Sequence, residues 1–143
     1  FRSGVKEASS DADQIAYVIK DSPDGFRVWS GNDNETFATM ATGGYGIVSV
    51  AGNIISGQVQ KMMGLLLEGD VEAAAAEHLR LLPIFNALFI ITNPIPVRYA
   101  INRSGFDVGP ARLPMIPESA ELESFSTRFD PIMDRYAIDL SEE

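Results

Sequence analysis

The sequence contains no cysteine and only one histidine, His78. The missing thiols exclude disulfide bonds, thiolate metal sites and cysteine nucleophiles. A metal site built from several histidines is excluded as well, and a Ser-His-Asp triad would have to use His78. Cysteine-based catalysis and metal sites with several histidines are therefore excluded, and a catalytic triad is possible only at His78.

Positive charge is scarce. Lys and Arg together number 11 against 20 Asp and Glu, which gives a net charge of −9 at pH 7. No basic stretch could neutralise a row of phosphates, so we expect no nucleic-acid partner. A basic face that would bind anionic lipid is missing too.

Long hydrophobic runs are also missing. The longest apolar stretch, residues 81–91, is interrupted by Pro83 and Asn86 and is too short to cross a bilayer. The first residues do not form a signal peptide, so we expect a cytoplasmic protein with no membrane partner. The sequence begins with Phe1 rather than Met and starts as if inside a strand, so we expect a further segment upstream.

The first third of the chain alternates strands and helices. Apolar or β-branched runs at 3–6, 26–30 and 46–50 predict strands, and residues 11–22 and 35–42 predict helices between them. Asp11, followed three residues later by Gln14, resembles a capping box that opens the first helix. Short strands that alternate with helices indicate a parallel sheet.

Strands end after about residue 54, and helices are expected for the rest of the chain. These cover 58–68, 70–82, a segment beginning near Pro94 and ending near Ser104, and 118–136, with an extended stretch at 112–117. Pro83 is expected to kink or restart the second of them.

A parallel sheet of three strands makes a poor domain, and a (β/α)₈ barrel needs about 250 residues. We therefore predict an α/β fold that is the C-terminal part of a (β/α)₈ TIM barrel, with about three β/α units, followed by a C-terminal helical region. Residues 1–56 would be the barrel portion, and residues 57–143 the last barrel helix and the helical region.

Lys6 is the candidate for chemistry. It lies at the carboxyl end of the first predicted strand, where (β/α)₈ enzymes place their active sites. Because side chains alternate along a strand, Lys6 and Glu7 should point to opposite faces. If Lys6 enters the mouth of a barrel, partial desolvation would lower its pKa and free the amine to attack a carbonyl. The alternative is a surface lysine paired with a carboxylate on a helix.

Five strings, in order, resemble one family. They are residues 4–9 (Gly-Val-Lys-Glu-Ala-Ser), 30–33 (Ser-Gly-Asn-Asp), 43–50 (Gly-Gly-Tyr-Gly-Ile-Val-Ser-Val), 93–98 (Asn-Pro-Ile-Pro-Val-Arg) and 112–114 (Arg-Leu-Pro). Together they resemble the dihydrodipicolinate synthase and N-acetylneuraminate lyase superfamily, with the first string matching its Schiff-base lysine segment. The resemblance covers residues 4–114 and weakens after Glu118.

The resemblance implies a class I, pyruvate-dependent lyase that needs no cofactor and no metal. Lys6 would form the imine with pyruvate, and the backbone at Val48 would contact the bound pyruvate. Gly31, Asn32 and Asp33 match positions that line the pocket. Asn32 stands where the family usually has Asp, and Arg98 stands where it usually has Lys.

The resemblance favours condensation of pyruvate with aspartate semialdehyde in lysine biosynthesis, within a cytoplasmic homotetramer. A sugar-acid aldolase, such as an N-acetylneuraminate lyase or a ketodeoxygluconate aldolase, is the alternative from the same superfamily. The family's relay tyrosines and carboxylate-binding threonines belong to earlier strands that this sequence lacks. We therefore expect this chain to need the N-terminal half of the barrel as a partner and to be inactive alone.

Two other possibilities stay open from the sequence. The chain could be a non-catalytic half-barrel that acts only through association, with Lys6 as a relic. It could also be a standalone α/β binding domain.

Overall fold

The computed structural model describes residues 3–115 and 119–136. The chain divides into two compact units, Phe1–Val50 with Gly57–Arg80, and Ala51–Ser56 with Leu81–Glu143. Each unit has its own buried apolar side chains. The division predicted after residue 56 concerned the barrel and its helical extension, and it stays a prediction.

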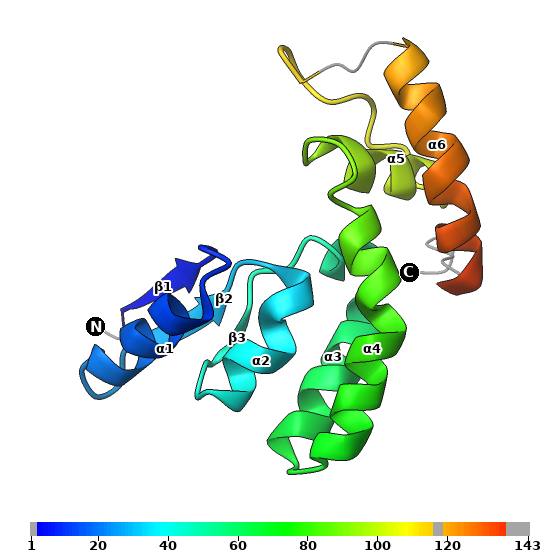
Figure 1. The fold of residues 1–143 in the computed structure, drawn as a ribbon. Helices are drawn as coiled ribbons and strands as arrows, with labels where there is room; N and C mark the ends of the chain where they lie inside the picture. The colour runs from blue at the N-terminus through cyan, green and yellow to red at the C-terminus, as the bar shows by residue number, and fades with distance from the viewer. Residues whose placement is uncertain (1–2, 116–118, 137–143) are drawn as a thin grey trace. The chain divides into compact units, whose positions relative to one another are not determined.

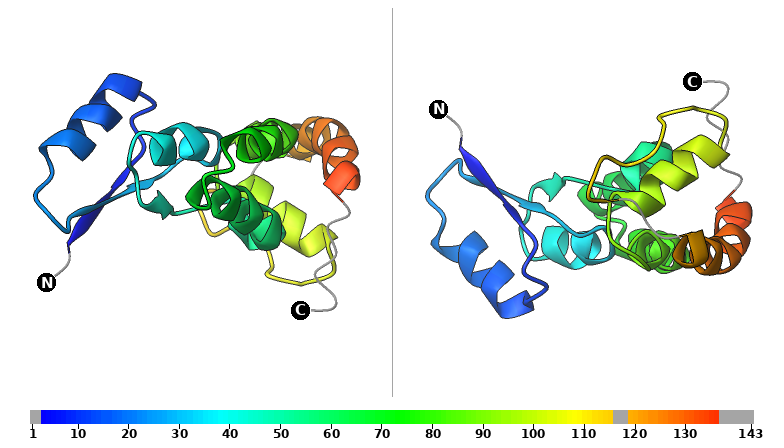
Figure 2. Two further views of the ribbon diagram at one scale, coloured as in Figure 1. Left: turned by 90° about the horizontal axis from the view of Figure 1, so that it is seen from below. Right: turned by 90° about the horizontal axis from the view of Figure 1, so that it is seen from above.

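The first unit contains a three-stranded parallel sheet. Its strands are β1 (Gly4–Glu7), β2 (Arg27–Ser30) and β3 (Gly46–Ile47), in the order β1-β2-β3. The connections contain α1 (Ala12–Asp21), η1 (Asp33–Glu35) and α2 (Thr36–Ala41), and both α-helices cover the same face of the sheet (Figures 1 and 2). The predicted alternation is confirmed.

The strand predicted at 46–50 is shorter than expected. Only Gly46 and Ile47 pair with β2, although the N–H of Val48 still donates to the carbonyl of Ser30 at 2.9 Å. The following residues turn away from the ladder because their polar groups bond elsewhere, to Asp33.

Helix α1 begins where the sequence indicates. The carboxylate of Asp11 accepts hydrogen bonds from the N–H groups of Asp13 and Gln14, each at 3.0 Å. Only this half of the capping box forms. The Gln14 side chain turns instead to the carboxylate of Glu7, with donor–acceptor distances of 3.3 and 3.4 Å.

The contacts of Glu7 fix the two faces of β1. Its side chain is buried, and its carboxylate accepts from the Ser9 N–H at 2.7 Å as well as from Gln14 of α1. Glu7 therefore faces the helices. Because side chains alternate along a strand, Lys6 must point to the opposite, open face of the sheet.

A helical hairpin follows the sheet. Its helices are α3 (Gly52–Leu67) and α4 (Val71–Ala87), and each spans the division between the two units. Within the first unit, Glu77 pairs with Lys61 and with Arg80, the latter at 2.7 Å. Asp70 caps α4, because its carboxylate accepts from the Ala73 N–H at 3.0 Å. Pro83 does not restart the helix, because α4 continues through it to Ala87.

The second unit is helical among its described residues. Helix α5 (Ile95–Arg103) begins after Pro94, as predicted, and α6 (Ser119–Met133) continues into η2 (Asp134–Tyr136). An aromatic cluster joins α5 to α6. Tyr99 meets Phe125 edge-on, with ring centroids 5.3 Å apart, and Phe125 lies 4.8 Å from Phe129. The end of the predicted extended stretch, Ile116 and Pro117, and the expected helix start at Glu118 lie outside the described residues.

A search of residues 3–115 and 119–136 finds no α-helix whose length and hydropathy suit a membrane span.

The contacts of Glu7 predict a pH dependence for the first unit. Hydrogen bonds from Ser9, its largest influence, lower the pKa of this carboxyl below 4.5. A lowered folded-state pKa contributes stability above the unfolded value, and that contribution is lost as the pH falls through the folded value. We expect Glu7→Gln to be less stable at neutral pH and to lose less stability on acidification below 4.5. Urea denaturation followed by fluorescence of Trp29, the sole tryptophan, measures this.

The exposed Glu68 provides a matched control. Glu68→Gln makes the same change of charge and should leave the acid loss of the parent chain intact. Equal acid profiles for the parent chain and Glu7→Gln would show that Glu7 does not hold β1 against α1.

Candidate active site

Lys6 lies on the open face of the sheet, one residue before the carboxyl end of β1. Its side chain is exposed in this chain. The described residues form a sheet of three strands, so no opposite wall covers this face. The desolvation was predicted for the mouth of a barrel, and it stays a prediction. The placement at the strand end agrees with the prediction.

Gly31 follows β2 and lies directly beside Lys6. A Cβ atom built on Gly31 would lie 2.5 Å from the Cβ of Ala8 and 2.8 Å from the Cε of Lys6, and real Cβ atoms essentially never come so close to a neighbour. Its own N–H donates to the carbonyl of Glu7 at 2.6 Å, which ties it to the end of β1. Gly31 thus leaves the space that the lysine side chain occupies.

Val48 presents backbone on the same face. Its N–H donates a hydrogen bond to the carbonyl of Ser30, but its own carbonyl accepts no hydrogen bond from the described residues. The side chain is 47% exposed. Of the two backbone polar groups, only the carbonyl therefore remains available for a ligand.

Trp29 and Tyr45 line the face around Lys6, and sequence reasoning did not assign them to the site. Trp29 pairs in register with Lys6 on one side and Gly46 on the other, so all three belong to one row. The Trp29 and Tyr45 rings meet edge-on at 5.3 Å, and the Arg27 guanidinium lies 3.8 Å over the Tyr45 ring. Register between strands, which no single-strand pattern gives, is the signal that would have found them.

Asn32 does not point freely into the open face. Its amide nitrogen donates to Glu35 at 2.8 Å and to the hydroxyl of Ser10 at 3.2 Å. These bonds link the loop after β2 to the loop after β1. Asn32 therefore connects two loops at the carboxyl edge of the sheet.

Asp33 is the one charged residue among the predicted site residues that is buried, at 1% exposure. Its carboxylate accepts from the Val50 N–H at 3.0 Å and from the hydroxyl of Ser49. These contacts join the loop after β2 to the loop after β3. The geometry favours positioning of the Val48–Val50 backbone over direct contact with a ligand.

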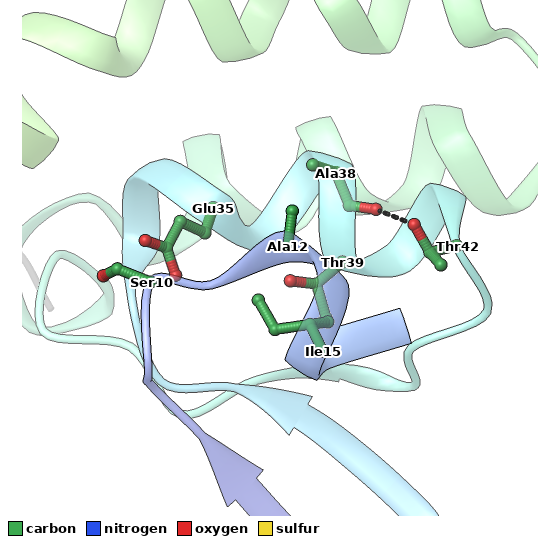
Figure 3. A pocket seen from close by; sticks show the side chains of 7 residues that line it. All are labelled: Ser10, Ala12, Ile15, Glu35, Ala38, Thr39 and Thr42. Carbon is green, nitrogen blue, oxygen red and sulfur yellow. Dashed lines mark hydrogen bonds between the residues drawn. The ribbon is translucent and has the colours of Figure 1, made fainter. Parts of the chain in front are cut away.

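A hollow lies on the helix-covered side of the sheet (Figure 3). Its cavity volume is about 110 Å³, and it is lined by Ser10, Ala12, Ile15, Glu35, Ala38, Thr39 and Thr42. It contains none of the five predicted site residues, so it is not the candidate active site. Within 3–115 and 119–136, no three His, Asp or Glu side chains are grouped to hold a metal ion.

A parallel β/α/β/α/β unit, followed by helices and carrying an amine at the carboxyl end of a strand, defines part of a (β/α)₈ barrel. Residues 3–127 match the model of the Dihydrodipicolinate synthetase family. The chain belongs to this family.

Relatives and solved structures agree with that assignment. A 4-hydroxy-tetrahydrodipicolinate synthase of Dehalococcoides mccartyi is 46% identical over 112 residues, which are 78% of this chain and 38% of the relative. The dihydrodipicolinate synthase of Aquifex aeolicus superposes with a TM-score of 0.88 at 33% identity, covering 96% of this chain and 46% of that one. The chloride-inhibited dihydrodipicolinate synthase of Acinetobacter baumannii, complexed with pyruvate, gives 0.78 at 26% identity, covering 89% and 44%.

These comparisons confirm the predicted family and the predicted fold, part of a TIM barrel followed by helices. They also show that the chain spans about two fifths of the length of the curated relatives it matches. The roles predicted for Lys6, Gly31, Asn32, Asp33 and Val48 are not tested by them and stay predictions.

If the buried Asp33 carboxylate holds the Val48–Val50 backbone in place, removing it should destabilise the first unit. We expect Asp33→Ala to lower the free energy of unfolding of the first unit by about 3 kcal/mol, because two donors lose a charged acceptor. Urea denaturation followed by Trp29 fluorescence measures the change. Asp24→Ala removes an exposed carboxylate from the turn before β2 and should change stability by less than about 0.5 kcal/mol. Similar effects for both variants would contradict the role.

Proposed function

We propose that this chain carries the Schiff-base lysine of a pyruvate-dependent class I lyase, with Lys6 as the nucleophile. The observation that carries the proposal is the position of Lys6 at the carboxyl end of β1, on the open face and beside Gly31. Family membership supports it, and so does the pyruvate bound to the Acinetobacter baumannii relative.

In the proposed reaction, the neutral amine of Lys6 attacks the keto carbon of pyruvate, and loss of water gives an iminium ion. Loss of a proton from the methyl carbon then gives an enamine, because the positively charged nitrogen accepts the electron pair. The enamine carbon attacks the aldehyde carbon of aspartate semialdehyde, whose oxygen takes up a proton, and the iminium ion forms again. The amino group of the same substrate then adds to the iminium carbon and displaces the Lys6 nitrogen, which leaves as the free amine for the next turnover.

The neighbouring residues take supporting roles in this proposal. The free carbonyl of Val48 would contact the bound keto acid, and Gly31 would keep the path of the lysine side chain open. Asn32 and Asp33 would hold the loops at the carboxyl edge of the sheet. No cofactor enters this scheme, since the imine itself is the electron sink.

The exposure of Lys6 sets a condition on this function. An amine in water stays mostly protonated at neutral pH, so it needs a covered site to be an efficient nucleophile. We therefore propose that this chain is inactive alone and acts with the remaining strands of a barrel, in a cytoplasmic homotetramer. The uncovered sheet face and the share of the relatives' length that the chain lacks support the need for further strands.

Reductive trapping tests the proposal. The chain is mixed with the complementary N-terminal part of the Dehalococcoides mccartyi relative, incubated with pyruvate and reduced with borohydride. We expect one pyruvate-derived adduct, found by peptide mass spectrometry on the fragment that contains Lys6. Without the complementary part, the yield should fall at least about tenfold.

Two variants make the experiment decisive. Lys6→Arg should abolish the adduct, because a guanidinium forms no imine. Lys20→Arg, on an exposed lysine paired with Asp21, should leave the yield unchanged. No adduct on Lys6 in a folded, mixed sample would refute the lyase assignment and favour a half-barrel that acts only through association.

A further inference from the structure

A second pocket, unrelated to the lysine site, lies within the helical unit. Its cavity volume is about 370 Å³, within the range of small-molecule sites. It is formed by α5, the segment 107–111 and one residue of α6, and it is lined by Ile95, Arg98, Tyr99, Asn102, Asp107, Gly109, Pro110, Ala111 and Leu122. It shares no residue with the proposed lyase site.

Arg98 gives this pocket a fixed positive charge. Its Nε donates to the carbonyl of Gly109 at 3.3 Å, and one terminal nitrogen donates to the carbonyl of Val108. These bonds use two of the five N–H groups of a guanidinium. In the part of the chain that the structure describes, no carboxylate lies within ion-pair distance of Arg98, whereas Arg103 on the same helix pairs with two.

This arrangement is unusual for a half-buried arginine. Arginine inside a protein is normally paired, because an unpaired charge that has lost part of its hydration is costly. The two carbonyls hold the guanidinium in place without neutralising it. Its remaining N–H groups are therefore oriented donors without an anionic acceptor among residues 3–115 and 119–136.

The wall beside Arg98 is apolar and rigid. Ile95, Pro110 and Leu122 contribute aliphatic surface. The Tyr99 ring is held in place because its hydroxyl donates to the carboxylate of Asp130 at 3.0 Å and because it makes T-shaped contacts with the rings of Phe125 and Phe129. Burial, followed by Asp130, raises the pKa of this hydroxyl, so Tyr99 stays neutral. A preformed wall limits the entropy lost on binding.

Asp107 is the one acid among the described residues that line the pocket, and its carboxylate is turned to the backbone. It accepts from the Gly109 N–H at 2.8 Å and forms no ion pair with Arg98. Asn102 fixes the same segment by accepting from the Val108 N–H at 2.8 Å and donating to the Gly109 carbonyl at 3.2 Å. The negative charge at the rim therefore weakens anion binding but does not cancel the donors of Arg98.

We propose that this pocket binds a small monocarboxylate with an apolar body. The carboxylate accepts a charge-assisted hydrogen bond pair from Arg98, and the body packs on Ile95, Tyr99 and Leu122. A single arginine suits a single negative charge. The net charge of −9 and the presence of Asp107 disfavour more highly charged anions such as phosphate esters.

The test uses phenylacetate and its neutral isostere phenylacetamide, titrated into the 143-residue chain and followed by backbone amide resonances in NMR. We expect phenylacetate to shift resonances of residues 95–111 saturably. Phenylacetamide should bind at least about tenfold more weakly, because it cannot form the charged hydrogen bonds. Arg98→Gln should weaken phenylacetate binding by a similar factor, and Asp107→Asn should strengthen it.

Arg128→Gln is the matched control, since Arg128 is exposed on α6 and does not line the pocket. It should bind phenylacetate as the parent chain does. Equal binding of the acid and the amide would overturn the proposal, as would unsaturable shifts or unchanged affinity in Arg98→Gln. If the spectrum of Arg98→Gln shows a disturbed 107–111 segment, the comparison of acid with amide on the parent chain decides.

Discussion

The contact between Glu7 and α1 is the constraint on which the candidate site depends. A strand has two faces, and neighbouring side chains cannot share one. Once the buried Glu7 carboxylate is held by Ser9 and Gln14, Lys6 has to emerge on the open face. A one-residue change in the pairing of β1 would exchange the two, placing an ammonium among the helices and a carboxylate where the amine belongs.

The parallel pairing of the strands determines which side chains of β2 and β3 share the face of Lys6. Lys6, Trp29 and Gly46 form one row, and the loops that follow the strands meet at one edge. Gly31 leaves room for the lysine, while Asp33 fastens the loop that carries Val48. The chain thus orders the surroundings of the amine but leaves the amine in water. Covering the amine requires strands beyond β1, β2 and β3, so the reactivity proposed for Lys6 depends on assembly.

Local patterns were sufficient to predict most elements, and the reasons for the failures are tertiary. Alternation predicted the sheet, and Asp11 predicted the start of α1. The third strand proved shorter because Ser49 and Val50 donate hydrogen bonds to Asp33, which is distant in sequence. The position of Trp29 and Tyr45 on the face that carries Lys6 depends on the register between strands. The pocket at Arg98 depends on how the 107–111 segment folds back on α5, which no helical or strand periodicity encodes.

The orientation of Lys6 is tested most directly by a crystal structure of this chain assembled with the N-terminal part of a relative, after reduction in the presence of pyruvate. We expect density continuous with Lys6 Nζ on the inner face of a closed barrel, with Glu7 still against Gln14 on the helix side. A Lys6 side chain among the helices, or pyruvate attached at another lysine, would contradict it.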